Sequence, residues 1–490
     1  MSGPQKQSTS FVLFGALGDL SLRKIFPAWF YLERGGLLDD SLRILGVARE
    51  NITTEQFQEK IIDALNLFVS SEFIDVDVCK SLVARIDYCH LDLTEPPNYQ
   101  KIKAALDGWD SATSYYLAIP PKLFETVCDN LYETGLVNEQ SRIVVEKPIG
   151  YNLESSNEIN DKMLKHFSES QIYRIDHYLG KETVQNLIAL RFANSLFSSQ
   201  WNSKSIEYIE ITAAESVGIE DRWGYFDGVG QMRDMVQSHL LQLLCLITME
   251  PPNQLDEQSI RYEKTQVLRA LKLLSEGDIS KTLIRAQYGD GEIAGTPKLG
   301  YLNQEGANAQ SETETFVCFR AEIANWRWSG TPIYLRTGKR MTDKVTKIVI
   351  HFKSDDHFIF DQDQKGSTTN SLIMKLHPTE GIYLQVHTKR HGVSEGMRLR
   401  SDPMSLDFAK THKLLNIPSG YQRLLLDVLK GNQSLFLCRE EIELAWRWCD
   451  DAIEAWNKSS QQLHTYPSGS YGPEITKTFI EQYGHLWHED

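Results

Sequence analysis

Cysteine is scarce in this sequence, and the cysteines that occur are scattered. The 490 residues contain seven of them, an odd number, and no two stand in a CxxC spacing. This pattern excludes a disulfide framework and a zinc ribbon, and it favours a reducing compartment. We therefore expect a cytoplasmic protein that holds no metal.

Long apolar runs are also missing. No segment is apolar over the roughly 20 residues that a membrane-spanning helix needs. The N-terminal stretch MSGPQKQSTS is polar and lacks the apolar core of a signal peptide. The sequence therefore predicts no membrane partner.

Positive charge is in short supply. Lys and Arg together number 51 against 66 Asp and Glu, which gives a formal net charge of −15. Such a surface repels nucleic acid and anionic membranes. A small phosphorylated ligand can still bind, but only where cations are locally concentrated.

The first third of the chain alternates short apolar runs with amphipathic stretches. Strands that alternate with helices form right-handed βαβ units, so we expect a Rossmann-like parallel sheet there. The strands are predicted at 10–14, 43–48, 85–93, 114–120 and 142–146, and helices between them at 54–66, 97–107 and 122–135.

After about residue 177 the pattern changes to alternating apolar and polar residues with few helices between the runs. This pattern predicts a larger domain with a mostly antiparallel sheet. We place the domain boundary between residues 176 and 177, giving domains 1–176 and 177–490. Strands are predicted at 206–212, 314–323, 345–353, 371–377 and 382–388, and helices at 181–196, 228–249, 420–431 and 438–457.

A glycine-rich turn follows the first predicted strand, in the segment FGALGDLSLRKIFPAWFYL (14–32). Gly15 and Gly18 allow a tight turn and close approach to a pyrophosphate, and the next helix offers its N–H groups. A lone GxxG is weak evidence, yet its place in the first βαβ unit favours nucleotide binding over an ordinary turn. Pro27 should kink the following helix or cap a shorter one.

Two cations follow predicted strands. Arg49 comes after the second strand, where it would attract the 2′-phosphate of NADP, although Glu50 beside it opposes this. Lys147 follows the fifth strand in EKPIG, and ligands bind beyond the carboxyl ends of parallel strands. Pro148 allows a cis peptide bond. Either cation can instead be an ordinary surface residue.

The segment RIDHYLGKE (174–182) gathers cations and hydrogen-bond donors just before a predicted helix. His177, Tyr178 and Lys181 at a helix N-terminus suit a phosphate dianion. A network of structural salt bridges at the domain junction is the alternative.

A second polar group precedes an apolar helical stripe, in AESVGIEDRWGYFDGVGQMRDMVQSHLLQLLCLI (214–247). His239 is the natural general base near neutral pH. A single His at the start of an apolar helix is more often structural, and a base needs a partner to orient it.

Together these segments resemble the glucose-6-phosphate dehydrogenase family. RIDHYLGKE is close to the family signature. GALGDLSLRK, EKPIG, the AES…RDMVQSHLLQ block, ETETF (312–316) and NWRWSGTPIYLRTGKRM (325–341) follow in family order at compatible spacings. The resemblance implies oxidation of glucose 6-phosphate at C1 to 6-phosphoglucono-1,5-lactone. The hydride passes to NADP+, in the first step of the oxidative pentose phosphate pathway.

The resemblance also implies a role for individual residues. It makes domain 1–176 the NADP-binding domain and domain 177–490 the substrate-binding and oligomerisation domain. The base is His239, and Asp176 pairs with it and would stabilise the imidazolium. The substrate-binding positions are Lys147, His177, Tyr178, Lys181, Glu215, Asp234, Lys339 and Lys344; the cofactor-binding positions are Gly15, Ala16, Leu17, Gly18, Asp19, Leu20, Ser21, Leu22, Lys24, Arg49 and again Lys147.

Two positions depart from the family pattern. Asp221 stands where Gly is common, and Ser238 stands where Asn is common, which leaves the local geometry open. Family members are usually dimers or tetramers built through the sheet of the second domain, so we expect a homodimer or homotetramer.

Two other readings stay open at this point. A related oxidoreductase could act on unphosphorylated sugars, but Lys181, Lys339 and Lys344 argue against it, since a neutral sugar needs no cation cluster. A nucleotide-binding regulator with a decayed site is the other alternative. The presence of both Asp176 and His239 argues against that one.

Overall fold

The chain forms two compact units in the computed structural model, which describes residues 9–109, 112–276, 278–354, 357, 359–360, 369–392, 396–407 and 420–488. Unit 1 comprises Met1–Glu182, Pro252–Tyr262 and Pro418–Glu443. Unit 2 comprises Thr183–Pro251, Glu263–Ile417 and Leu444–Asp490. The sequence pattern alone does not show that two late segments belong to unit 1.

Unit 1 is built on a six-stranded sheet whose strand pairs are all parallel, in the order β3-β2-β1-β4-β5-β6. The predicted Rossmann-like sheet is therefore confirmed. The sixth strand was missed, because three residues are too few to show a pattern. The strands are β1 Ser10–Phe14, β2 Arg43–Ala48, β3 Ile86–His90, β4 Thr113–Leu117, β5 Arg142–Val145 and β6 Ile172–Arg174.

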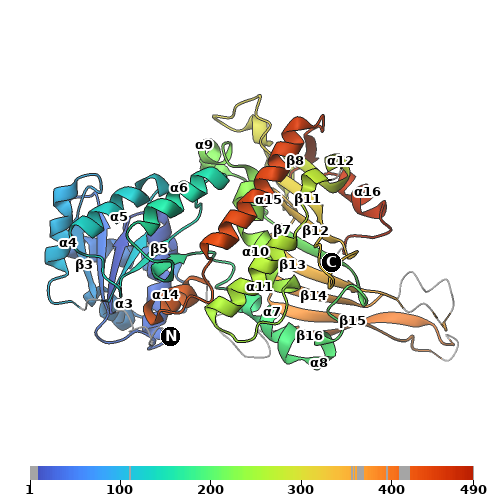
Figure 1. Cartoon of the computed structure of the whole chain (residues 1–490), viewed down its shortest axis with the longest axis horizontal. Helices are drawn as coiled ribbons and strands as arrows, with labels where there is room; N and C mark the ends of the chain where they lie inside the picture. Colours follow the sequence, from blue (N-terminus) through green and yellow to red (C-terminus); the bar gives the residue numbers. More distant parts are fainter. Residues whose placement is uncertain are drawn as a thin grey trace. The chain divides into compact units, whose positions relative to one another are not determined.

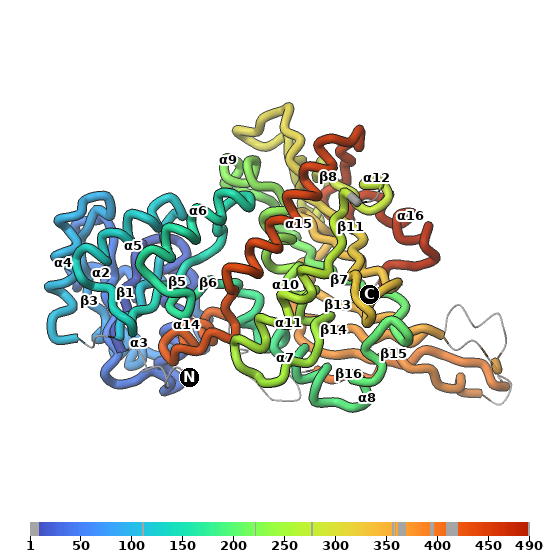
Figure 2. The backbone as a smooth tube through the Cα atoms, in the orientation of Figure 1, coloured from blue at the N-terminus to red at the C-terminus, as the bar shows by residue number. Residues whose placement is uncertain are grey.

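Helices cover the sheet of unit 1, and a late segment of the chain joins them. Side chains of α14 pack into the same apolar cluster as those of α1, α2 and α3. Figures 1 and 2 show α14 in orange among the blue N-terminal elements. Pro27 is the second residue of α1, where a residue without a backbone N–H is tolerated, and the π-helical turn Ser21–Ile25 precedes it. The helices are α1 Phe26–Arg34, α2 Thr54–Phe68, α3 Val76–Ala84, α4 Tyr99–Ala105, α5 Phe124–Glu133, α6 Leu153–Leu164 and α14 Gly420–Lys430.

Unit 2 contains a nine-stranded sheet in the order β16-β15-β14-β13-β7-β12-β11-β8-β17. Only the pairs β7–β12 and β8–β17 are parallel within it, so the mostly antiparallel sheet is confirmed. Its strands are β7 Ile206–Ala214, β8 Leu283–Gly289, β11 Phe316–Ala321, β12 Ile333–Gly338, β13 Val345–Phe352, β14 Ser371–His377, β15 Gly381–Lys389, β16 Leu399–Asp407 and β17 His464–Pro467; β9 Gly291–Ile293 and β10 Thr296–Lys298 form a separate hairpin.

The predicted helix 228–249 divides into two kinds of helix. Met232–Leu240 is π-helical, and the α-helix α10 follows at Leu241–Thr248.

Within the described residues, no helix is both long and apolar enough to cross a membrane. The remaining helices are α7 Glu182–Ala193, α8 Ser195–Ser198, α9 Trp223–Phe226, α12 Ile279–Thr282 and α16 Ile475–Glu481, while α11 Glu257–Ala270 and α15 Arg439–Lys458 have residues in both units.

The C-terminal segment packs on the sheet of unit 2 through a histidine. The ring of Tyr208 stacks between His351 and His485, with centroids 4.0 and 4.2 Å away. Nδ1 of His485 lies 2.8 Å from the hydroxyl of Tyr334. Burial, together with the nearby His351 and Arg320, lowers the pKa of His485 from its ordinary value of 6.5 to about 4, although the charge of Glu210 opposes the shift.

Acid should therefore weaken unit 2 at His485. Between pH 6.5 and about 4, His485 binds a proton in the unfolded chain but stays neutral in the folded chain. The free energy of unfolding therefore falls as pH falls through this window. We expect the unfolding midpoint of the wild type to drop more steeply over this window than that of His485→Gln, which cannot titrate. Thermal unfolding at half-unit pH steps measures the difference. Parallel curves for the two proteins would contradict the prediction.

Candidate functional site

The glycine-rich turn of unit 1 is shaped by its own hydrogen bonds. Gly15 has φ of +78°, and a Cβ there would lie 2.2 Å from the carbonyl oxygen of Ala118, so the position requires glycine. The N–H groups of Gly15 and Ala16 donate to the Val47 carbonyl, and that of Gly18 donates to Gly15. A phosphate would therefore be held by the first helical N–H groups, from Asp19 onward. Of the predicted cofactor residues here, Ala16 and Ser21 are buried, Gly15, Leu17, Leu20 and Leu22 are partly exposed, and Gly18, Asp19 and Lys24 are exposed.

Arg49 is exposed just beyond β2, at the same edge of the sheet as the glycine-rich turn. The neighbouring Glu50, which opposes binding of a 2′-phosphate, has its carboxylate 3.5 Å from Lys60 on α2. The pKa of Asp92 is lowered mainly by hydrogen bonds from Thr94, and also by the charge of Arg49. Glu50, the acid next to Arg49, thus pairs with Lys60. This pairing leaves the Arg49 guanidinium better placed to receive an anion.

Lys147 follows β5 and is partly exposed, and its peptide bond to Pro148 is cis. The preceding residue, Glu146, is buried and accepts a hydrogen bond of 2.6 Å from the Tyr116 hydroxyl. Burial raises the pKa of Glu146, although hydrogen bonds from Tyr116 and Tyr421 oppose the rise. No sequence pattern indicated a role for Glu146. In the structure its hydrogen bond with Tyr116 anchors the end of β5 next to Lys147.

The segment after β6 turns tightly on Asp176. This carboxylate is 1% exposed, and its Oδ1 accepts from the N–H of Tyr178 at 2.9 Å. The turn exposes part of His177 and of Lys181, and Nζ of Lys181 lies 3.9 Å from the ring centre of Tyr178. Arg174 is fully buried and pairs with Glu169 at 2.7 Å. The predicted phosphate-binding residues of unit 1 thus stand together, and Arg174 is structural.

Unit 2 brings three residues far apart in sequence into one cluster. Nζ of Lys339, just after β12, donates to Glu215 at 2.7 Å and to Asp234 at 3.1 Å. Lys339 is only 7% exposed, and both carboxylates remain partly accessible. Burial disfavours the charged form of Lys339, but the attraction of the Asp234 and Glu215 carboxylates outweighs it. The pKa of Lys339 is therefore raised. The cluster is a charged, preorganised set of donors and acceptors suited to sugar hydroxyls.

The π-helix Met232–Leu240 carries Asp234 and His239. Residues five apart lie close to one face of a π-helix, whereas in an α-helix they diverge by about 140°. His239 is 1% exposed. Ser238 beside it is buried, and its hydroxyl has no hydrogen-bond partner among the described residues. The π-helix thus places His239, the predicted base, toward the side that carries Asp234.

Two further positions from the sequence analysis are Lys344 and Asp221. Lys344 is exposed, one residue before β13. Within the described residues, the side chain of Lys344 makes no hydrogen bond or ion pair. The side chain of Asp221 lies outside the described residues, and its neighbour Glu220 has φ of +45°.

Comparison with known proteins identifies the family. A model of the glucose-6-phosphate dehydrogenase NAD binding domain matches residues 12–186, and a model of the C-terminal domain matches residues 188–488. The chain belongs to the glucose-6-phosphate dehydrogenase family. It is 42% identical to glucose-6-phosphate 1-dehydrogenase of Dickeya dadantii over 99% of this chain and 98% of that one. It is 43% identical to that of Rhizobium meliloti over 98% and 97%.

A solved structure agrees with this assignment. A glucose-6-phosphate dehydrogenase in complex with its substrate glucose-6-phosphate matches with a TM-score of 0.90 at 32% identity, covering 100% of both chains. The resemblance predicted from the motifs is confirmed. This glucose-6-phosphate dehydrogenase family member is an oxidoreductase with a Rossmann-like NAD(P)-binding domain.

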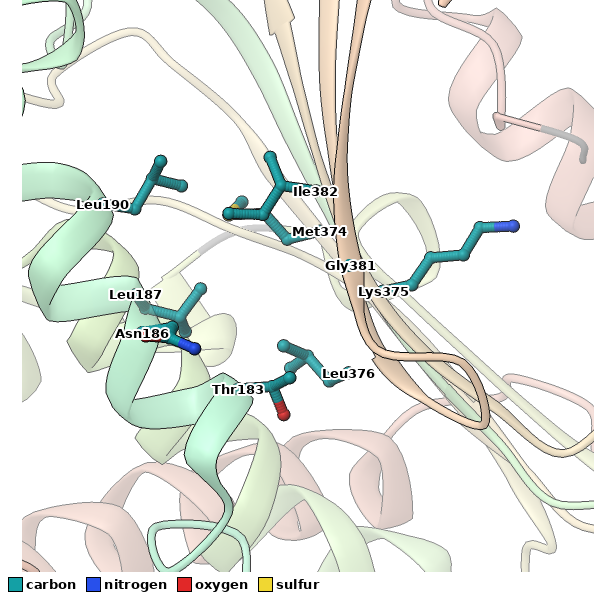
Figure 3. Close-up of a pocket in the computed structure, with 9 residues that line it drawn as sticks. All are labelled: Thr183, Asn186, Leu187, Leu190, Met374, Lys375, Leu376, Gly381 and Ile382. Carbon is teal, nitrogen blue, oxygen red and sulfur yellow. The ribbon is translucent and has the colours of Figure 1, made fainter. Parts of the chain in front are cut away.

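A small hollow in unit 2 of this family member is not a second candidate for the sugar site. It lies between α7 and the β14–β15 hairpin, and Figure 3 shows Leu187, Leu190, Met374 and Ile382 around it. The side chain of Lys375 points away from the hollow, to the other side of the sheet. Apart from Lys375, the residues that line it are uncharged, with Thr183 and Asn186 as the polar side chains.

Proposed function

We propose that this protein oxidises glucose 6-phosphate at C1 to 6-phosphoglucono-1,5-lactone, with NADP+ as hydride acceptor, in the first step of the oxidative pentose phosphate pathway. The observation that carries the proposal is the buried Lys339 cluster at the start of the π-helix that also carries His239. Oxidation of a sugar carbon needs a base for the hydroxyl proton and an acceptor for the hydride. His239 is the base, and NADP+ supplies the acceptor when bound.

The remaining roles follow from the family resemblance and the local geometry. His177, Tyr178 and Lys181 bind the substrate phosphate. Glu215 and Asp234 accept from sugar hydroxyls, and Lys339, which bridges the two carboxylates, is itself a substrate-binding cation. The further substrate cations are Lys147, which also contacts the cofactor, and Lys344, and Asp176 is the partner of the base.

The cofactor lies at the glycine-rich turn, from Gly15 through Leu22, with Lys24 and Arg49 at its phosphates. We further propose that the protein is cytoplasmic and forms a homodimer or homotetramer. The division into domains 1–176 and 177–490 is part of the same proposal, as is the absence of a metal from the reaction.

A single assay tests the function. Absorbance of the reduced nicotinamide is followed with glucose 6-phosphate or glucose, and with NADP+ or NAD+. Fast reduction of NADP+ by glucose 6-phosphate, with slow reduction by glucose, is the expected result. Equal rates for the two sugars would favour an oxidoreductase of unphosphorylated sugars.

Replacement of Arg49 by Ala tests the choice of cofactor. An Arg guanidinium makes two parallel hydrogen bonds to a 2′-phosphate, and NAD+ offers only a hydroxyl there. We expect kcat/KM with NADP+ to fall about ten- to a hundredfold and that with NAD+ to change little. Lys80→Ala on α3 is the matched control, because it removes another exposed cation of unit 1, one that faces Asp77 at 3.9 Å and has no part in the proposed cofactor site. A parallel loss with both cofactors would mean that Arg49 stabilises the turn.

A further inference from the structure

Glu314 is a buried carboxylate that the proposed function leaves unused. It is 4% exposed, and its Oε1 accepts from the N–H of Met232 at 3.0 Å. Its backbone carbonyl accepts from the N–H of Gln231, also at 3.0 Å. Two consecutive N–H groups at the start of the π-helix are thus bound by one residue from another part of the chain.

The turn before the π-helix is built around this carboxylate. Gly230 has φ of +75°, and a Cβ there would lie 2.5 Å from Oε1 of Glu314. Glycine is favoured on both counts, since the left-handed backbone strains other residues and a Cβ would displace the Glu314 carboxylate. The contact between Glu314 and the π-helix therefore depends on both partners: the carboxylate of Glu314 and the glycine at position 230.

The next residue extends this link to the Lys339 cluster. The carbonyl of Thr315 accepts from the N–H of Lys339 at 3.0 Å, and Thr315 is fully buried. One dipeptide thus fixes the backbone of Lys339 and the first turn that carries Asp234. Nζ of Lys339 and Oδ2 of Asp234 lie 3.1 Å apart.

We infer that Glu314 is a positioning residue for the reaction: it holds the π-helix in the register that places Asp234 and His239. This inference rests on the proposed function. Burial raises the pKa of Glu314, although the hydrogen bond from Met232 and the charge of Arg233 act to lower it. The contact needs only an oxygen acceptor at the position of Oε1, which a glutamine amide also supplies.

Three variants test this role: Glu314→Ala, Glu314→Gln and, as matched control, Glu312→Gln in the same ETETF run, where the side chain is 80% exposed. A small displacement of catalytic groups typically costs about a hundredfold in rate. We expect Glu314→Ala to raise KM for glucose 6-phosphate and lower kcat, with kcat/KM falling roughly ten- to a hundredfold. Glu314→Gln should stay within about threefold of wild type, since its amide oxygen keeps the hydrogen bond.

NADP+ affinity separates positioning from general damage. The dissociation constant of NADP+, measured by tryptophan fluorescence, should be unchanged in every variant. If Glu314→Ala does not fold, Glu314→Asp takes its place, because its shorter side chain falls short of Met232 while keeping the carboxylate. The inference is overturned if the folded Ala or Asp variant matches Glu312→Gln, if Glu314→Gln loses as much as they do, or if NADP+ affinity falls in proportion. Wild type inactive on glucose 6-phosphate would instead overturn the proposed function.

Discussion

Replacing His239 by Asn should abolish most of the turnover and leave glucose 6-phosphate binding nearly intact. Asn has a similar shape and can hydrogen-bond, but it cannot accept the proton of the C1 hydroxyl. Loss of a general base typically lowers the rate by roughly 10²–10⁴-fold. Steady-state kcat and the substrate dissociation constant, measured separately, show whether chemistry alone is lost.

Ser238→Ala is the control for the His239 variant. Ser238 is the next residue of the same π-helix, and its hydroxyl has no partner among the described residues, so the change removes no described hydrogen bond. We expect its turnover to stay near that of the wild type. If His239→Asn turned over at a near-normal rate at neutral pH, the base would have to be another group.

Replacing Lys181 by Ala should weaken glucose 6-phosphate far more than free glucose. A charge-assisted hydrogen bond contributes about 1.5–3 kcal/mol, which corresponds to about 10- to 150-fold in affinity. The ammonium of Lys181 lies 3.9 Å from the Tyr178 ring centre, a position that leaves part of it accessible to an anion. The ratio of kcat/KM for the two sugars, before and after the change, measures the effect on the phosphate alone.

Lys165→Ala, at the C-cap of α6, is the matched control for Lys181. Its ammonium is also in unit 1, but it faces Glu125 at 3.6 Å and should not affect either sugar. Equal losses for glucose and glucose 6-phosphate in Lys181→Ala would show that this lysine supports the fold and does not contact the phosphate.

Much of the first domain could be predicted from local pattern. A buried parallel strand is a short apolar run, and β1, β2, β4 and β5 fall within or beside the predicted runs. The glycine-rich turn could be predicted too, because Gly15 directly follows such a run. Several strands were missed. β6, Ile172–Arg174, is too short to show a pattern, and β12, Ile333–Gly338, mixes apolar and polar residues although all six are buried. In unit 2 the sequence pattern also missed β8, β9, β10, β16 and β17.

The sequence by itself determined which chemical groups are present: a base candidate in His239, a phosphate receptor around Lys181 and an acidic pair in Glu215 and Asp234. Only the tertiary structure decided their arrangement. Lys339 meets Glu215 because β7 and β12 are parallel neighbours, and Asp234 reaches the same ammonium from the π-helix; both contacts join segments far apart in the chain.

The π-helix is the clearest case of tertiary control. The apolar stripe of 228–249 predicts an α-helix, in which Asp234 and His239 would point in different directions. A π-helix is less stable than an α-helix as a local structure, so it persists only where the surroundings hold it. Here Glu314 binds the N–H of Met232 at its start, across 82 positions of the chain. No local pattern of residues 232–240 contains that constraint, because the residue that supplies it lies outside the segment.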